Sequence, residues 1–207
     1  KILKQVGLCV PDQIEVGNGS ITEYIERYQR VVVKPARGEQ GDGVYVDLNT
    51  IEEVNEAVEK AKKYCEKVII EEFVEGEDLR IIDIDNKVVA AAVRKPATIK
   101  GNGELTIREL IFKQSRRRAA ATHGESSIPL DKETIRTIEK HEYTLEDVLP
   151  RGKTLNVRKT ANLHTGGTIH DVTAQLHPAL EKAAIEGAVA LGIPVVGFDF
   201  LVTAVDR

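Results

Sequence analysis

The sequence predicts an α+β fold built as two lobes. Segments with the alternating pattern of strands and segments with the periodicity of amphipathic helices follow one another along the 207 residues. A chain of this length can bury one core or two small ones. Residues 97–150 differ from the rest because they are polar, charged and only weakly periodic. We therefore expect two mixed lobes, with an insertion at residues 97–150.

In the first half of the chain, cap and turn signals mark the ends of the expected elements. Thr50 and Glu53 have the spacing of a capping box, which predicts that a helix begins there. Asp85 and Asn86 separate two strand-like runs and predict the turn of a hairpin. Strands are expected at residues 31–34, 44–48, 67–71, 79–84 and 87–93.

The second half gives similar signals around its helices. Pro178 suits the first turn of a helix and Gly192 suits its end. A second helix is expected to begin at Asp131. The remaining expected elements are a helix at residues 106–118, strands at 154–159 and 168–172, and a buried strand at 194–202.

Composition narrows the class of protein. No apolar run approaches the ~20 residues that cross a bilayer, and no signal-peptide pattern is present. Cys9 and Cys65 are too few for a disulfide framework, which favours a reducing cytoplasm. The formal charge of -4 argues against nucleic acid as a partner. We expect a cytoplasmic protein that acts on small molecules, with homo-oligomerisation left open.

The strongest local signal is VVVKPARGEQGDGVYV, residues 31–46. Lys34 ends a hydrophobic strand and is followed by Gly38, Gly41 and Gly43. The glycines let backbone N–H groups approach phosphate oxygens, and the lysine adds a positive charge. Because the lysine precedes the glycines, a P-loop is not expected. The alternative is a plain hairpin with an exposed lysine.

A second candidate lies in VIIEEFVEGEDLRII, residues 68–82. Successive residues of a strand face opposite sides, so Asp78 and Arg80 share one face. A carboxylate can accept hydrogen bonds from ribose hydroxyls, and an arginine can donate two hydrogen bonds to phosphate oxygens. A surface ion pair explains the same pattern.

The third candidate is VRKTANLHTGGTIHDVT, residues 157–173. Arg158, Asn162 and the turn at residues 165–167 offer a cation, an amide and backbone donors to an anionic intermediate. A plain glycine turn between strands is the alternative. A zinc site is also conceivable, although its spacing is not diagnostic, from three histidines: His164, His170 and His177.

The fourth candidate is Asp199 within VVGFDFLV, residues 195–202. Phe198 and Phe200 face one way and Asp199 the other. A carboxylate in a buried strand is costly unless it is paired or metal-bound, which makes Asp199 a candidate Mg²⁺ ligand. Elsewhere, the basic run Arg116 to Arg118 is expected to be a solvated helix face, with a clamp for an acidic substrate as the second interpretation and nucleic-acid binding as the third.

Taken together and in this order, the four segments resemble the ATP-grasp superfamily, and the resemblance covers nearly the whole chain. It implies an ATP-grasp fold in which two α+β lobes clasp ATP, in a chain truncated at both ends. The family's later Glu and Glu-x-Asn metal motif and its upstream lysine are not found in the sequence. The implied division is an N-terminal helix and linker (1–17), a small lobe (18–72) and an incomplete large lobe (73–207).

The resemblance also implies roles for individual residues. The stretch Glu71, Glu72, Phe73 and Val74 is similar to the adenine-binding hinge of the family, where the main chain at Glu72 and Val74 binds the base. Asp78 would bind ribose, and Asp199 would be the first carboxylate that binds Mg²⁺. The phosphates of ATP would be held by Lys34, Gly38, Gly41 and Gly43.

Longer runs resemble particular ligase families. RKTANLHTGGTIHDVT is similar to cyanophycin synthetases. SRRRAAATHGESSIPLD, TANLHTGGTIHDVTAQLHPAL and EGEDLRIIDIDNKVVAAAVRKPA look most like bacterial N-acetylglutaminylglutamine synthetases. These similarities imply an ADP-forming carboxylate–amine ligase that forms an amide bond through an acyl phosphate, with amino acids or dipeptides as substrates.

In such a ligase, Arg80, Arg158 and Asn162 would be catalytic. The substrate would be bound by His164, Thr165, Gly166 and Gly167. Three alternatives stay open at this point: a cyanophycin-like amino-acid ligase, a ligase that glutamylates a protein, and a module that binds nucleotide without catalysis.

Overall fold

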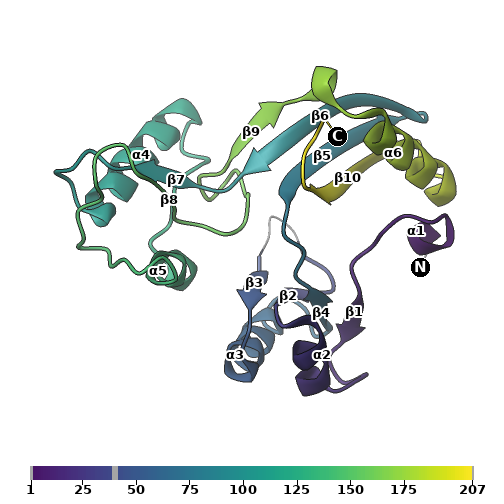
Figure 1. The fold of residues 1–207 in the computed structure, drawn as a ribbon, viewed down its shortest axis with the longest axis horizontal. Coiled ribbons are helices and arrows are strands. Elements are labelled where there is room, and N and C mark those ends of the chain that lie inside the picture. The colour runs from purple at the N-terminus through teal and green to yellow at the C-terminus, as the bar shows by residue number, and fades with distance from the viewer. Residues whose placement is uncertain (1, 39–41, 207) are drawn as a thin grey trace. The chain divides into compact units, whose positions relative to one another are not determined.

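The computed structural model describes residues 2–38 and 42–206 (Figure 1). The chain forms two compact units. Unit 1 extends to Ala91 and resumes at Val172, and unit 2 comprises Ala92–Asp171. The α+β fold class is confirmed by helices and antiparallel sheets. The lobe division at residues 17 and 72, and the insertion at 97–150, stay predictions.

The first sheet of unit 1 has the antiparallel strand order β1-β4-β2-β3. Its elements are β1 (Gln13–Glu15), α2 (Ile21–Tyr28), β2 (Val31–Pro35), β3 (Tyr45–Leu48), α3 (Ile51–Ala61) and β4 (Val68–Glu72). Alternate side chains of β2 point into the core, where Val31 and Val33 are fully buried. Helix α3 contributes one apolar stripe with helical spacing to this core: Val54, Ala57, Val58 and Ala61.

Helix α3 begins directly after its N-cap residue Thr50, as predicted. The Thr50 hydroxyl accepts the N–H of Glu53 at 3.2 Å. The Glu53 carboxylate accepts the N–H of Asn49 at 3.0 Å. The N–H groups in the first turn of a helix lack partners within the helix, so the bond from Glu53 to Thr50 helps to fix where α3 begins.

The second sheet has the strand order β10-β5-β6-β9. Strands β5 (Glu77–Ile84) and β6 (Lys87–Lys95) form the predicted hairpin, and the turn residues Asp85 and Asn86 have φ angles of 52° and 61°. Positive φ at both central residues is what a type I′ turn requires. Strand β10 (Val195–Val202) is antiparallel to β5. The unit boundary falls within β6, whose residues from Ala92 onward pair with β9 (Thr168–Asp171).

Helix α6 (Pro178–Leu191) packs on β5 and β10 (Figure 1). Both of its ends follow the sequence signals, since Pro178 lies in the first turn and Gly192 adopts the left-handed conformation at φ 64°. Gly187 allows the close approach, because a Cβ there would lie 2.8 Å from Cζ of Phe198. Two short elements complete unit 1: α1 (Ile2–Gln5) and the 3₁₀ helix η1 (Thr173–Gln175).

The expectation of a buried strand at residues 194–202 is wrong. In β10 only Phe198 and Val202 are buried, while Val195 and Leu201 are 60% and 49% exposed. Strand β10 lies at the edge of its sheet among the described strands. An edge strand that packs on one face buries only alternate side chains, so a hydrophobic run does not guarantee burial.

Unit 2 packs two helices on a short strand pair, with α4 against β7 and α5 against β8 (Figure 1). The elements are β7 (Thr98–Lys100), α4 (Ile107–Ala121), α5 (Lys132–Glu139), β8 (Thr154–Asn156) and β9. Its core includes Ile107 and Ile111 from α4 and Ile138 from α5. None of the helices in the described part of the chain is long and apolar enough to span a bilayer.

The strand expected at residues 154–159 ends early, at Asn156. Its partner β7 has only three residues, and Lys100 pairs with Thr154 while Thr98 pairs with Asn156. One further backbone bond, from the Val157 N–H to the Ala97 carbonyl at 2.9 Å, continues the contact. The length of the partner strand therefore sets the length of β8.

A glycine in unit 2 gives a test of this packing. A Cβ at Gly101 would lie 2.2 Å from the Pro150 carbonyl oxygen and 2.5 Å from that of Leu149. Both are backbone atoms, so Gly101→Ala should lower the free energy of unfolding by about 1–3 kcal/mol, the usual cost of overpacking. Denaturant unfolding measures the loss. Gly19→Ala, where a Cβ meets only Ile14 Cδ1 at 3.9 Å, is the control and should change little. Equal effects of the two substitutions would contradict the packing of unit 2.

Candidate functional site

Lys34 is held by a carboxylate from the neighbouring strand. Its Nζ lies 2.7 Å from Oε2 of Glu71. Lys34 is on β2 and Glu71 on β4, where Lys34 pairs with Ile69 and Val32 pairs with Glu71. The two side chains are therefore diagonal neighbours on one face of the sheet, close enough for long side chains to meet. This contact orients the lysine near the end of β2. Residues 36–43 follow β2, and we call them the first glycine loop.

The first glycine loop is only partly described. Gly41 lies outside the described residues. Gly43 is buried and has φ 69°, and a Cβ there would lie 2.8 Å from Cδ2 of Tyr64. A side chain at this position would be both strained and crowded. Gly38 is exposed and has room for a Cβ, since Pro35 Cγ would be 3.4 Å away. The binding roles of these glycines stay predictions.

The predicted hinge at the end of β4 is fixed by its backbone. The Glu72 N–H donates to the Asp12 carbonyl, and the Phe73 N–H donates to the Arg30 carbonyl, both at 3.0 Å. The Val74 N–H has no hydrogen-bond partner within the described part of the chain. An N–H group of this kind is available to an acceptor on a ligand.

Arg30 is a residue of this hinge that the sequence motifs did not indicate. Its guanidinium lies 4.2 Å from the centre of the Phe73 ring. It also forms an ion pair with Asp47 at 2.6 Å. A cation over an aromatic face is attracted by the ring electrons, so Arg30 fixes the position of Phe73. Arg30 lies just outside the motif at residues 31–46, and its partners Asp47 and Phe73 are distant in the sequence, which is why only the structure shows these contacts.

Arg80 and Asp199 face each other across two strands. They are direct partners in the register of β5 and β10, and Nη1 of Arg80 lies 2.9 Å from Oδ1 of Asp199. As predicted, Leu79 and Ile81 point to the buried side of β5, and Asp78 and Arg80 to the other. The Asp199 side chain is 54% exposed and is paired with Arg80, so burial does not require a metal ion at this carboxylate.

Gly197 makes room for the Arg80 side chain. A Cβ at Gly197 would lie 2.2 Å from Nη2 of Arg80 and 2.5 Å from its Cζ. Gly197 and Asp199 are two residues apart on β10 and share a face. The guanidinium therefore lies over the backbone of Gly197 while it contacts Asp199, and no local sequence motif indicates this role of Gly197.

The described residues do not assemble a metal site. Within residues 2–38 and 42–206, no group of three or more His, Cys, Asp or Glu side chains is placed to hold an ion. Asp199 alone, with Arg80 on one of its oxygens, does not make a magnesium site. The zinc alternative is not supported either, because the three imidazoles bond to different groups: His164 to the Glu125 carbonyl, His170 to the Thr168 hydroxyl and His177 to the Ala179 N–H.

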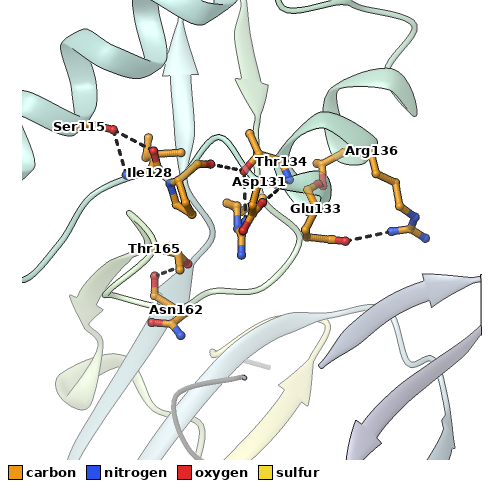
Figure 2. Close-up of polar contacts among 11 residues, drawn as sticks. Ser115, Ile128, Asp131, Glu133, Thr134, Arg136, Asn162 and Thr165 are labelled. Carbon is orange, nitrogen blue, oxygen red and sulfur yellow. Dashed lines mark hydrogen bonds and ion pairs between the residues drawn. The ribbon is translucent and has the colours of Figure 1, made fainter. Parts of the chain in front are cut away.

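Arg158 is the buried cation of a partly exposed charge cluster in unit 2. Its Nη1 lies 2.6 and 2.7 Å from the two carboxylate oxygens of Asp131 and 3.1 Å from the Thr134 hydroxyl. Its side chain is only 10% exposed. Among the described residues its Nε has no hydrogen-bond partner, and the same holds for Oε1 of Glu133. Figure 2 shows Asp131, Thr134 and Glu133 with Arg136 along α5.

The cluster moves two carboxylate pKa values in opposite directions. Burial raises the pKa of Glu133, and the nearby Arg136 and Arg158 offset this only in part. Burial also raises the pKa of Asp131, but the Thr134 N–H and the Arg158 guanidinium lower it by more, so it lies below its usual value. Arg158 thus stabilises the charged form of Asp131, while Glu133 carries the cost of desolvation.

The residues 161–167, which we call the second glycine loop, form a tight turn in unit 2. The Gly167 N–H donates to the Asn162 carbonyl at 2.8 Å, and the Gly166 N–H donates to the Leu163 carbonyl at 3.3 Å. The Asn162 side-chain oxygen accepts the His164 N–H at 2.8 Å. The Thr165 hydroxyl donates to the Asn162 carbonyl (Figure 2). These N–H groups already donate to carbonyl groups within the loop. Their predicted role as donors to an intermediate stays a prediction.

The structure brings the predicted residues together in local sets. Lys34 and Glu71 meet on the first sheet, Arg80 and Asp199 meet on the second sheet, and Arg158 joins Asp131 in unit 2. The convergence of these sets in one cleft stays a prediction, as does the binding of ribose by Asp78.

Comparison with known proteins identifies the family. The sequence model described as "D-ala D-ala ligase C-terminus" matches residues 3–141. Cyanophycin synthetase from Trichormus variabilis is 36% identical over 189 residues, which cover 89% of this chain and 21% of that protein. The glutathione biosynthesis bifunctional protein GshAB from Streptococcus mutans is 30% identical over 212 residues, which cover 98% of this chain and 28% of that protein.

Solved structures agree on the fold. A bifunctional glutathione synthetase from Pasteurella multocida superposes with a TM-score of 0.58 at 21% identity, over 100% of this chain and 29% of that one. A D-alanine–D-alanine ligase from Bacillus anthracis gives a TM-score of 0.57 at 17% identity, over 97% of this chain and 50% of that one.

The fold and its matched sequence are those of an ATP-grasp protein. The chain belongs to the D-ala D-ala ligase C-terminus family of that superfamily. It spans 21% to 28% of the length of these two curated relatives.

The pKa of Glu133 leads to a prediction about pH. Because folding raises this pKa, the stability linked to Glu133 is fully present below its ordinary value of 4.5 and is lost as the pH rises through the raised value. Glu133→Gln should therefore raise the melting temperature at neutral pH and leave it unchanged below pH 4.5. Thermal unfolding at the two pH values measures this. Glu139→Gln, an exposed position on the same helix, is the control. A Glu133→Gln protein that is less stable at neutral pH would refute the assignment.

Proposed function

We propose that this chain is the nucleotide-binding core of an ATP-dependent carboxylate–amine ligase. Ligases of the ATP-grasp family use ATP and Mg²⁺ and form amide bonds. The observation that carries the proposal is the ion pair of Lys34 with Glu71. It holds a cation at the end of β2, beside both the first glycine loop and the hinge after β4.

The first sheet supports a site for the adenosine and the phosphates. Lys34 offers a positive charge that Glu71 keeps in place. The backbone N–H groups of the first glycine loop are proposed to bind phosphate oxygens. The unpartnered Val74 N–H suits a ring nitrogen of adenine. Arg30 contacts the ring of Phe73, the residue that precedes Val74. Asp78 is proposed to accept hydrogen bonds from the ribose hydroxyls.

The second sheet supports the transfer of the γ-phosphoryl group. Arg80 is proposed to bind oxygens of that group, with the Asp199 carboxylate fixing the guanidinium. Asp199 would contribute one carboxylate oxygen to a magnesium ion, whose chemistry is to neutralise phosphate charge. Because the described residues do not complete a magnesium site, no step below depends on that ion.

The proposed reaction has two steps. A carboxylate oxygen of the substrate attacks the γ-phosphorus, the bond to the β-phosphate oxygen breaks, and ADP leaves with an acyl phosphate formed. The amine then attacks the acyl carbon, and phosphate leaves as the amide bond forms and the amine loses a proton. The residues assist mainly by positioning and by neutralising charge, as in other phosphoryl transfers. Arg158, Asn162 and the second glycine loop are proposed to serve the second step.

For the substrates, we propose the joining of glutamine-derived units, as in N-acetylglutaminylglutamine synthesis. The sequence runs around Arg118, Asn162 and Asp78 support this choice. A cyanophycin-like reaction is the second candidate, and the 36% identity to a cyanophycin synthetase favours it. Supplying glutamine derivatives or cyanophycin as alternative substrates, and identifying the product formed, separates the two.

Removal of the lysine charge tests the nucleotide site. Lys34→Ala should lower ATP-dependent ADP release by about a hundredfold or more, the usual effect of deleting one charge-stabilising group. A coupled ADP assay with amino-acid mixtures measures it in the full-length protein. Lys63→Ala, at an exposed lysine after α3, is the matched control and should behave like the wild type. Normal turnover in Lys34→Ala would remove the assignment.

The absence of a side chain at Gly197 gives a second test, which concerns the placement of Arg80. Gly197→Ala should push the guanidinium away from Asp199 and lower ADP release about tenfold to a hundredfold, as misplaced catalytic groups do. In an Arg80→Ala background the same substitution should add nothing, because its target is already gone. Additive losses in the double variant would show that Gly197 acts through another group.

A further inference from the structure

The basic run Arg116 to Arg118 is not a single surface feature. Arg116 and Arg117 are exposed, but Arg118 is half-buried. Its Nε donates to the Ser126 hydroxyl at 3.0 Å, and its Nη2 donates to the Gly167 carbonyl. The expectation of a uniformly solvated helix face is therefore wrong for Arg118, because the end of the second glycine loop lies within reach of its guanidinium.

The Ser126 side chain connects Arg118 to a second position in the second glycine loop. The Ser126 hydroxyl donates to the Leu163 carbonyl while accepting from Arg118. Ser126 itself is 4% exposed, and its N–H donates to the Thr122 hydroxyl at 3.0 Å. Arg118 thus contacts the loop directly at Gly167 and indirectly at Leu163.

Further hydrogen bonds connect α4 to the segment that contacts the second glycine loop. Ser115 and Arg118 of α4 are three residues apart and share one face of the helix, and the C-cap Thr122 follows four residues after Arg118. The Ser115 hydroxyl accepts the Ile128 N–H at 2.9 Å and donates to its carbonyl at 3.2 Å (Figure 2). The segment before α5 is therefore tied to α4, and the loop is tied to that segment by the Ser127 N–H and the His164 carbonyl.

The second glycine loop has little room to rearrange. A Cβ at Gly166 would lie 2.4 Å from Cγ1 of Ile128, and one at Gly167 would lie 2.7 Å from the Asn162 carbonyl oxygen. The Gly167 N–H bonds to that same carbonyl. A shift of Gly167 would therefore displace Asn162, the residue proposed to hold the reacting groups.

We propose that Arg118 is a positioning residue for the second glycine loop, and that it sets the placement of Asn162 and His164 toward the amino-acid substrate. The assignment rests on the proposed function for its catalytic consequence but not for its structural part. Arg118 touches the loop and Ser126, and it acts on the substrate only through them.

Hydrogen exchange tests the structural part without any substrate. In the full-length protein, Arg118→Gln should speed exchange of the Gly166 and Gly167 amides about tenfold or more, because a lost hydrogen bond to a charged donor frees the loop. Arg117→Gln removes the same charge one residue earlier and should leave these amides unchanged. Equal exchange in the two variants overturns the proposal.

Kinetics tests the catalytic part, with glutamine as the probe amine. Arg118→Gln should lower kcat/KM for glutamine about tenfold while the KM for ATP stays at the wild-type value. Arg118→Lys keeps the charge but cannot make both bonds, so it should restore only part of the loss and show that the protein folds. An equal rise in both KM values overturns the proposal. If the wild type releases no ADP, the proposed function fails while the exchange comparison still decides the role of Arg118.

Discussion

The candidate sites depend on one electrostatic constraint, which is that each cation is held by a carboxylate of a neighbouring element. Glu71 holds Lys34, Asp199 holds Arg80, and Asp131 holds Arg158. Long cationic side chains lose rotamer freedom when they are fixed, and they lose hydration when they are partly buried. A carboxylate in contact offsets both costs, so the cation is oriented by the protein itself.

Backbone geometry decides which carboxylate each cation finds. Arg80 and Asp199 are direct partners in the register of β5 and β10, and Gly197 leaves the space through which the guanidinium passes. Lys34 and Glu71 are offset by two residues across β2 and β4. A slip of one residue in either register would turn one partner to the opposite face. The antiparallel sheets of the ATP-grasp fold therefore place these charges as much as the side chains do.

In unit 2, the contacts of Arg158 and Arg118 involve helices α5 and α4. The N-cap carboxylate of α5, Asp131, receives Arg158, and the polar face of α4 supports the second glycine loop through Arg118 and Ser126. The neutral hydroxyls of Ser115 and Ser126 connect backbone segments that have no regular secondary structure. Buried polar groups need such partners, and a network in which every member is satisfied makes the segments that it joins more rigid.

The sequence by itself determined the local structure and the family. Caps at Thr50 and Asp131, the turn at Asp85 and Asn86, and the glycine after α6 all set element ends that the structure confirms, because each signal acts within a few residues.

Only the tertiary structure decided the partners of the charges and the depth of burial. Arg80 and Asp199 are 119 residues apart in the chain, and Arg118 and Gly167 are 49 apart, so no local pattern links them. The hydrophobic run of β10 also did not reveal that Asp199 is exposed, since burial depends on what covers each face of a sheet. Periodicity reports the shape of one element, whereas contacts between distant segments are set by how the elements pack.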